Sequence, residues 1–308
     1  GPGQAVRIFT GAPVPDGADK VVIQEDVTKS GDMISITDDP GPKDNIRPAG
    51  VDFAEGMEIA APRRLSPGDI ALLASMNIAV VPVACAPVVA LISTGDELVV
   101  PGETPGPDQI IASNTYGLAA MLEGIGARPR ILPIARDTKN ALRTVFDLTQ
   151  GADLIVTIGG ASVGDHDLVA GVAAELGMEQ SFYKVAMRPG KPLMAGRLHG
   201  APMVGLPGNP VSAMVCGAVF LVPMLNAMLG LGQAPAGRIS LPLSASLTAN
   251  GPREHYMRGV IAGGIIADAG AQDSSLLSVL ARANALIVRP PHDPARAVGD
   301  LVEAIPLG

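Results

Sequence analysis

The chain has 308 residues, of which 47% are hydrophobic and only 3% aromatic, so it is long enough for two or three domains with aliphatic cores. Its formal net charge is -8 and it contains no Lys/Arg-rich run, which argues against a nucleic-acid partner. Its two cysteines lie far apart, no signal peptide is apparent and no apolar window reaches the roughly 20 residues of a membrane span, so we expect a cytoplasmic protein without disulfides or membrane contact.

The N-terminal quarter of the chain is predicted to form two small parts. Residues 1–50 alternate short β-like runs, among them Lys20–Gln24 and Met33–Ile36, with turns rich in glycine and proline. This pattern predicts a β-rich domain. Residues 51–85 contain one short helical segment, Pro67–Ser75, and we interpret them as a connector between larger bodies.

Strands and helices alternate between residues 86 and 232. Val88–Ile92 has the composition of a fully buried strand, and a helix with one apolar face is expected from Ser113 or Asn114 to about Gly124, with Asn114 as a plausible cap. The elements expected next are the strand Arg130–Ile134, the helix Thr138–Thr149, the strand Asp153–Ile158, the helix Asp167–Leu176, a strand pair around Leu193–Leu198 and Pro202–Leu206, and a long apolar helix from about Pro210 to Leu229. This alternation predicts a parallel sheet covered by helices.

Residues 233–308 contain short apolar runs that are separated by glycines and prolines. Arg238–Leu241 and Ala285–Arg289 are typical of strands, and no segment shows a convincing helical period. We therefore expect this part of the chain to fold as a small C-terminal β-barrel or sandwich.

Glycine-rich loops follow three of the predicted strands. They contain Thr94-Gly95, Gly159-Gly160-Ala161-Ser162-Val163-Gly164 and Pro207-Gly208-Asn209. Ligands of open α/β sheets bind outside the carboxyl ends of the strands, where glycines let the main chain approach an anion and a serine adds a hydroxyl. The second loop is therefore a candidate phosphate cradle, although an ordinary glycine-rich turn explains one such loop equally well.

Acidic residues gather at the same predicted edge. They are Asp96, Glu97, Asp137, Asp165 and Asp167. Carboxylates of this kind can hold Mg²⁺ together with phosphate and water. Helix capping is the alternative, and it has most weight for Asp137. Glu97 and Asp167 favour the metal, because each follows a glycine-containing turn.

The segment from Lys184 to Pro192 carries three cations, Lys184, Arg188 and Lys191, between prolines that stiffen it. Cations held in this way suit a substrate with phosphate groups, or an oxyanion such as molybdate. A solvated basic loop is the alternative interpretation. In an acidic chain, three cations beside a glycine cradle favour anion binding.

Four motifs together carry a family resemblance. They are Thr94-Gly95-Asp96-Glu97-Leu98, Gly159-Gly160-Ala161-Ser162-Val163-Gly164-Asp165, Arg188-Pro189-Gly190-Lys191-Pro192 and Gly208-Asn209-Pro210-Val211-Ser212-Ala213. In order and spacing they strongly resemble the molybdopterin molybdotransferase family. Arg188 stands where that family usually has lysine, Val51 stands where it commonly has glutamate, and about a hundred N-terminal residues of the family are missing, which is the size of a domain.

The resemblance implies a multidomain α/β fold. Its parts are a partial β-rich domain at residues 1–50, a connector at 51–85 that belongs to an elongated dimerisation domain, a central three-layer α/β/α (MogA-like) domain with a mostly parallel sheet at 86–232, and a small C-terminal β-barrel at 233–308. The resemblance also implies a homodimer in which Arg47 and Asp52 reach the site of the partner subunit.

The resemblance implies the insertion of molybdate into adenylylated molybdopterin, with Mg²⁺ and with release of AMP. It also suggests contact with the molybdopterin adenylyltransferase that acts one step earlier. The catalytic residues implied are Glu97, Asp167 and Asp137, and the metal ligands are Asp96, Glu97 and Asp167. Substrate binding is assigned to Thr94, Gly95, Asp96, Gly159, Gly160, Ser162, Gly164, Lys184, Arg188, Lys191, Pro207, Gly208, Asn209, Ser212, Arg47 and Asp52.

Two other functions compete with this interpretation. One is the adenylyltransferase itself, which would consume ATP, and the β-rich flanking segments count against it. The other is a non-catalytic scaffold like the related domain of gephyrin, and the joint presence of Glu97, Asp167 and Lys191 counts against that. Nothing in the sequence separates molybdate from tungstate, because the two oxyanions have nearly the same size and charge.

Overall fold

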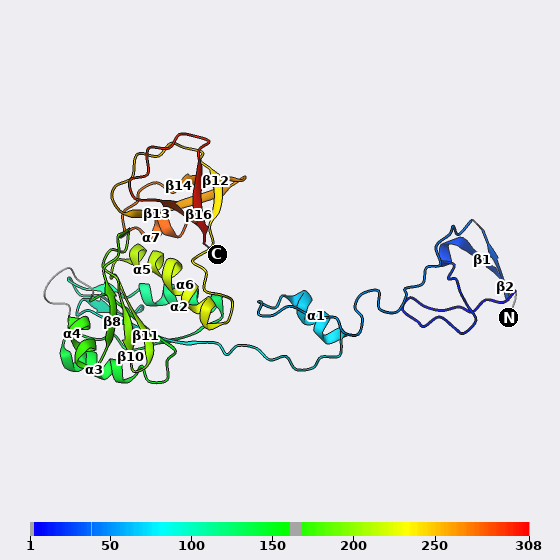
Figure 1. Ribbon diagram of the computed structural model, residues 1–308, viewed down its shortest axis with the longest axis horizontal. Coiled ribbons are helices and arrows are strands. Elements are labelled where there is room, and N and C mark those ends of the chain that lie inside the picture. Colours follow the sequence, from blue (N-terminus) through cyan, green and yellow to red (C-terminus); the bar gives the residue numbers. More distant parts are fainter. Residues whose placement is uncertain (1–2, 38, 161–167, 308) are drawn as a thin grey trace. The chain divides into compact units, whose positions relative to one another are not determined.

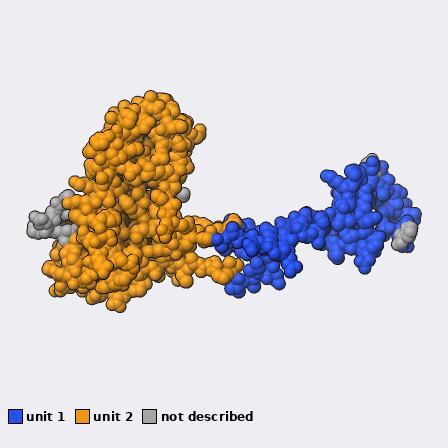
Figure 2. Space-filling model, viewed as in Figure 1, with its two compact units in different colours: residues 1–61, 65–80 blue, residues 62–64, 81–308 orange. Residues whose placement is uncertain are grey.

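The computed structural model describes residues 3–37, 39–160 and 168–307, and the chain forms two compact units (Figure 1, Figure 2). Unit 1 comprises Gly1–Ala61 and Leu65–Val80, and unit 2 comprises Pro62–Arg64 and Val81–Gly308. The expected division of the chain at residues 50, 85 and 232 stays a prediction.

Unit 1 contains one β-hairpin, formed by the antiparallel strands β1 (Val27–Ser30) and β2 (Met33–Ile36), after the short 3-10 helix η1 (Gln24–Asp26). The prediction of a strand at Lys20–Gln24 is wrong. There, the N–H of Val21 donates to the carbonyl of Asp44 at 2.8 Å, and the chain then turns into η1 instead of pairing with a strand.

Helix α1 (Pro67–Ser75) has the bounds that the sequence predicted. A capping box explains its start: the N–H of Asp69 donates to Ser66 Oγ at 3.1 Å, and the N–H of Ser66 donates to the Asp69 carboxylate at 2.8 Å. Pro67 supports this start, because the first turn of a helix does not need its missing N–H group.

A six-stranded sheet in the order β6-β3-β7-β11-β10-β8 forms the centre of unit 2. Its strands are β3 (Val88–Ser93), β6 (Arg128–Ile131), β7 (Leu154–Ile158), β8 (Glu179–Tyr183), β10 (Met194–Leu198) and β11 (Ala201–Leu206). The first four in spatial order are parallel and the last two pair antiparallel, which confirms the mostly parallel sheet. Strand β6 begins two residues earlier than expected. Strand β8 was not expected, because this exposed edge strand lacks an apolar pattern.

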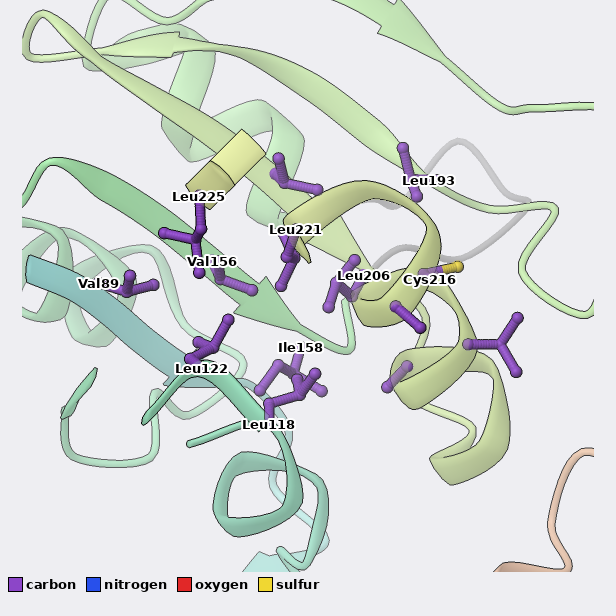
Figure 3. Close-up of a cluster of buried hydrophobic side chains, with 14 of the residues drawn as sticks. Val89, Leu118, Leu122, Val156, Ile158, Leu193, Leu206, Cys216, Leu221 and Leu225 are labelled. Atoms are coloured by element: carbon purple, nitrogen blue, oxygen red, sulfur yellow. The ribbon is translucent and has the colours of Figure 1, made fainter. Parts of the chain in front are cut away.

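Helices cover both faces of this sheet and give three layers (Figure 1). One face carries α2 (Asn114–Ile125), α5 (Pro210–Cys216) and α6 (Val222–Met228), and the other carries α3 (Lys139–Asp147) and α4 (Leu168–Glu175). Successive side chains of strand β7 point to opposite faces of the sheet and therefore contribute to both cores. Val156 and Ile158 pack with Leu118 of α2 on the first face (Figure 3), whereas Ile155 joins the cluster on the second.

The long apolar helix expected at residues 210–229 is interrupted by a π-helical segment, η2 (Gly217–Leu221). In this segment the N–H of Val222 bonds the carbonyl of Gly217, five residues earlier, and the next residue, Pro223, has no N–H to bond the carbonyl of Val219. The segment Pro210–Met228 is long and apolar enough to cross a membrane, with a mean hydropathy of 1.9. Leu221 and Leu225 are fully buried in the core, however, so burial inside the domain accounts for this composition.

The C-terminal part of unit 2 is a small β-barrel. Its strands, in the order β12-β16-β15-β13-β14, are β12 (Ile239–Pro242), β13 (Glu254–Ala262), β14 (Ile265–Asp268), β15 (Ala285–Arg289) and β16 (Leu301–Pro306). A bridge between Leu243 and Ile266 joins the two ends of this path. The predicted C-terminal barrel is thus confirmed. The short helix α7 (Leu277–Leu280) was not expected.

Candidate functional site

The loops that follow β3, β7 and β11 pack against one another at the carboxyl edge of the sheet. The N–H of Thr94 donates to the carbonyl of Ile158 at 3.0 Å, and the N–H of Gly159 donates to that of Leu206 at 3.0 Å. A Cβ atom on Gly159 would lie 2.8 Å from the Thr94 carbonyl oxygen, so only glycine fits there. The structure therefore brings together the three glycine loops that the sequence singled out.

Asn114 links two of these loops from the first turn of α2. Its side-chain amide donates to the carbonyl of Gly208 at 2.7 Å. The prediction that Asn114 caps α2 is wrong, because Ser113 holds the cap position and Asn114 is already helical. Among the described residues, Asn114 Oδ1 and Thr94 Oγ1 are buried without a hydrogen-bond partner.

The carboxylates beside this junction, Asp96, Glu97 and Asp137, are exposed and form what we call the carboxylate edge. The N–H of Asp137 donates to Asp96 Oδ1 at 3.1 Å, which joins the loops after β3 and β6. The side chain of Glu97 folds back over Gly95, where a Cβ atom would overlap the carboxylate. Three of the predicted site residues, Ser162, Gly164 and Asp167, lie outside the described residues.

Arg136 holds the carboxylate edge in place, a role that was not predicted from the sequence. Its Nη1 donates to the main-chain carbonyls of Gly95, Asp96 and Leu98 at 3.3, 2.9 and 3.0 Å. A single guanidinium therefore fixes the path of the backbone that carries Asp96 and Glu97.

The carboxylate edge offers oxygen ligands of the kind that Mg²⁺ prefers. Mg²⁺ is usually held by one or two carboxylates together with substrate phosphates and water, and Asp96 and Glu97 offer two adjacent, exposed carboxylates. In the part of the chain that the structure describes, no group of three or more metal-binding side chains is present.

A second feature is an open cleft of about 380 Å³ between the α/β domain and the C-terminal barrel. We call it the cation cleft. Its lining residues are Arg188, Pro189, Gly190, Lys191, Pro192, Pro207, Asn209, Ser212, Arg253, Gln272, Asp273 and Ser274.

Main-chain contacts between the two domains fix both walls of the cation cleft. Strand β9 (Met187–Arg188) of the α/β domain pairs in parallel with β13 of the barrel, and Arg188 lies opposite His255. On the other wall, the N–H of Val211 donates to the Ser274 carbonyl at 3.1 Å, and the Asn209 amide donates to Ser274 Oγ at 3.2 Å. The barrel is therefore part of the site.

The loop that carries Arg188 and Lys191 packs tightly onto the core helix. Gly190 has φ +108° and is buried, and a Cβ atom there would overlap Cys216 Sγ on α5. The carbonyl of Lys191 accepts a hydrogen bond from the N–H of Val185 at 3.0 Å, which closes the loop. The position of both cations is thus set by backbone packing.

Positive charge dominates the surroundings of this cleft. Burial lowers the pKa of His255 to about 4, and four arginines add to the effect: Arg188, Arg258, Arg289 and Arg253. The imidazole is therefore neutral at pH 7. Asp273 is the acidic group in the lining, and hydrogen bonds from Ser275 hold its pKa below the usual value. Three cations against one carboxylate suit a dianion.

The cation cleft collects five of the residues predicted to bind substrate: Arg188, Lys191, Pro207, Asn209 and Ser212. Lys184 is not among the lining residues. It is exposed, and its ammonium lies 5.0 Å from the ring centroid of Tyr183. Arg47 and Asp52 are exposed side chains of unit 1.

Sequence reasoning missed the four lining residues of the barrel, Arg253, Gln272, Asp273 and Ser274. One signal was available. Arg253, His255 and Arg258 interrupt a segment that is otherwise apolar enough for a buried strand, and basic groups at such positions need a function or a partner.

Comparisons with family models cover most of the chain. The matching descriptions are "MoeA N-terminal region (domain I and II)" for residues 1–77, "Probable molybdopterin binding domain" for residues 90–227 and "MoeA C-terminal region (domain IV)" for residues 240–307. The order of these three parts agrees with the resemblance seen in the motifs.

Curated relatives are similar over nearly the full chain. A molybdopterin molybdenumtransferase of Nostoc sp. is 36% identical over 301 residues, which is 94% of this chain and 69% of the relative. "Molybdopterin molybdenumtransferase 2" of Mycobacterium tuberculosis is 37% identical over 295 residues, 93% of this chain and 73% of the relative.

A solved structure supports the fold. The "molybdopterin biosynthesis moea protein" from Pyrococcus horikosii is 28% identical, with a TM-score of 0.75, and the alignment covers 94% of this chain and 72% of that one. The expected fold, a MogA-like α/β domain within a multidomain chain, is thereby confirmed.

Proposed function

This chain belongs to the MoeA family of molybdopterin molybdenumtransferases, and on that premise we propose that it inserts molybdate into adenylylated molybdopterin and releases AMP. Molybdenum would join the two dithiolene sulfurs of the pterin, and the phosphoanhydride bond to AMP would be cleaved. Molybdate and adenylylated molybdopterin are thus the two substrates.

The observation that carries this proposal is the cation cleft. Arg188, Lys191 and Arg253 come from two domains of an acidic protein and line one open cavity together with the neutral donors Gln272 and Ser274. Guanidinium and ammonium groups bind tetrahedral oxyanions through charge-assisted hydrogen bonds. We assign the binding of molybdate, or of the pterin phosphate, to this cleft. Pro207, Asn209 and Ser212 complete the wall on the side of α5.

The carboxylate edge supports the second half of the reaction. We assign Asp96 and Glu97, with Asp167, to a Mg²⁺ ion, and Glu97, Asp167 and Asp137 to catalysis. Mg²⁺, when bound, would offset the negative charge that develops on the phosphates. A carboxylate at this edge would orient the attacking oxygen, and Arg136 would keep the backbone of that carboxylate fixed.

The glycine loops would receive the substrate between these two features. Gly159 and Gly160 have positive φ angles, and a Cβ atom on either would lie within 3 Å of Thr94, so glycine lets this loop lie close to the loop after β3. We assign both glycines to contact with a phosphate of the substrate. Thr94, Gly95 and Gly208 belong to the same contact region. We assign Ser162 and Gly164 to this loop as well, and Lys184 to the approach of the anionic substrate.

The assembly belongs to this proposal too. We expect an elongated cytoplasmic homodimer in which Arg47 and Asp52 act at the site of the partner subunit. Both side chains are exposed in unit 1 and available for such a contact. We also expect contact with the adenylyltransferase that produces the substrate, because such a contact would allow transfer of the adenylylated pterin without its release.

The test is AMP release from adenylylated molybdopterin with Mg²⁺, measured with and without molybdate and again after addition of EDTA. We expect release that depends on molybdate and is lost with EDTA. The variants Arg188→Gln and Lys191→Gln should raise the KM for molybdate, and Arg143→Gln, on the exposed surface of α3, is the matched control. ATP consumption without AMP release would identify an adenylyltransferase instead, and no turnover of either kind would contradict catalysis.

A further inference from the structure

Arg258 is a buried cation that lies behind the lining of the cation cleft. It is on β13 of the barrel, it is fully buried and its side chain is the largest in the protein's interior together with Arg289. It does not line the cleft itself. A buried guanidinium costs free energy unless its donors and its charge are compensated, so its presence calls for an explanation.

The side-chain bonds of Arg258 go to the segment of residues 271–273, which enters the cleft lining. Its Nη2 donates to the carbonyls of Ala271 at 2.7 Å and Asp273 at 3.0 Å. Its main chain forms two bonds with the amide of Gln272, whose Oε1 accepts at 2.9 Å and whose Nε2 donates at 3.1 Å. The guanidinium thus fixes the main chain at Ala271 and Asp273, on either side of Gln272 in the cleft lining.

The compensation of Arg258 is incomplete in the part of the chain that the structure describes. Its Nε and Nη1 are buried and have no hydrogen-bond partner there. Asp273 attracts the guanidinium, but Arg188, which lines the cleft, repels it. The repulsion between Arg258 and Arg188 destabilises the folded protein. A dianion bound in the cleft would offset this repulsion, because it attracts both guanidinium groups.

We propose that Arg258 is a positioning residue for the cation cleft: it holds residues 271–273 at the cleft wall and adds buried positive charge behind Arg188, and both effects favour a tetrahedral dianion. This inference rests on the proposed function, since it concerns the affinity of the same cleft. It makes the barrel domain a determinant of oxyanion binding through a residue that the substrate does not touch.

The experiment measures molybdate binding to the full chain by equilibrium dialysis, with inorganic phosphate titrated in parallel. Phosphate separates the two tetrahedral dianions that could occupy the cleft, free molybdate and the phosphate group of the pterin. The variants are Arg258→Met, which removes charge and donors, and Arg258→Lys, which keeps the charge but replaces the planar guanidinium that bonds the carbonyls of Ala271 and Asp273 with a shorter side chain of different donor geometry. Loss of residues that orient ligand-binding groups weakens binding by about 10–100-fold in metal sites, and we expect about tenfold for Arg258→Met.

Arg289 provides the matched control. It is also almost fully buried, on the neighbouring strand β15, but it pairs with Asp293 and bonds the carbonyls of Thr248 and Pro294, which do not line the cleft. Arg289→Lys should lower the thermal stability as Arg258→Lys does, yet leave the Kd for molybdate unchanged. In turnover, Arg258→Lys should raise the KM for the substrate whose dianion occupies the cleft, molybdate or adenylylated molybdopterin, and leave the KM for the other within twofold.

The outcomes separate this inference from the function on which it rests. Wild-type chain that neither binds molybdate nor releases AMP overturns both. Wild-type activity together with an unchanged Kd in folded Arg258→Met overturns the role of Arg258 alone, and so does an equal loss of affinity in Arg289→Lys. If Arg258→Met does not fold, Arg258→Lys decides: a Kd raised at least threefold supports the role, and a wild-type Kd contradicts it.

Discussion

Asn114 donates a hydrogen bond of 2.7 Å from its side-chain amide to the main-chain carbonyl of Gly208, 94 residues further along the chain. This bond connects the first turn of α2, where Thr115 is hydrogen-bonded to Ser93 at the end of β3, to the loop that leads into α5 and the cation cleft. The Asn114–Gly208 hydrogen bond therefore links the carboxylate edge to the cation cleft. A change at Asn114 should affect both.

The variant Asn114→Ala should lower the free energy of unfolding by about 1 kcal/mol, the usual net value of one hydrogen bond. Because the loop at Gly208 would lose its tether, we also expect kcat/KM to fall by about tenfold, since small misplacements in a site are costly. Thermal unfolding and AMP release measure the two effects. Asn140→Ala, on the exposed surface of α3, is the control and should change neither.

Arg136→Met tests whether the carboxylate edge needs its backbone anchor. Three carbonyls of the loop would lose their common donor, so Asp96 and Glu97 would sample more positions. We expect kcat to fall by about tenfold or more, and we expect a higher Mg²⁺ concentration for half-maximal activity. Arg143→Met removes an exposed arginine whose ion pair with Glu175 is screened by solvent, and it should leave kcat unchanged. Wild-type kcat and Mg²⁺ dependence in Arg136→Met would show that Arg136 does not fix the carboxylate edge.

The parts of the fold that the sequence predicted are those with strong local signals. Val88–Ile92 is apolar throughout because it is buried on both sides, and Ser66 with Asp69 marks the start of α1. Lys20–Gln24 has a shorter apolar run, Val21–Ile23, and no strand of the described residues pairs with it. Neighbours in space, which composition does not reveal, decide such cases.

The residues of the candidate site also fall into those that a local pattern predicted and those that it did not. Arg188 and Lys191 follow a visible motif, and so do the glycines of the strand ends. The barrel residues Arg253 and Gln272 reach the same cleft only because β9 pairs with β13, a contact between segments that are more than sixty residues apart. A local sequence pattern does not predict a pairing between segments that are so far apart in the chain.

Gly190 gives a test of how the cation loop is held. Gly190→Ala should destabilise the protein by about 2–4 kcal/mol, since a positive φ costs about 1 kcal/mol and overlap with Cys216 adds about 1–3 kcal/mol. Gly200→Ala is the matched control, because Gly200 also has a positive φ but faces open space, so only the smaller cost should appear.

A second substitution isolates the overlap at Gly190. Removing the thiol with Cys216→Ala should recover part of the loss, so that the double variant is more stable than the two single effects predict. Chemical denaturation of the four proteins completes the cycle. Strict additivity would show that Gly190 is needed for its backbone angle alone.

His255 makes the stability of the barrel depend on pH. Burial and the neighbouring arginines lower its pKa from the usual 6.5 to about 4 in the folded protein. The unfolded chain therefore takes up a proton at a higher pH than the folded one. The stabilising contribution is complete above about pH 6.5 and is lost as the pH falls towards 4, by about 2–3 kcal/mol over that window.

His255→Gln should remove this loss, so that the stability difference between wild type and variant narrows or reverses from pH 7 to pH 4. His292→Asn, at an exposed position on the same barrel, should follow the wild-type curve. Molybdate adds a second reading, because a dianion in the cation cleft would offset the field of Arg188 and raise the pKa of His255. Titration of His255 by NMR with and without molybdate should therefore show an upward shift, and an unchanged pKa would mean that the anion binds elsewhere.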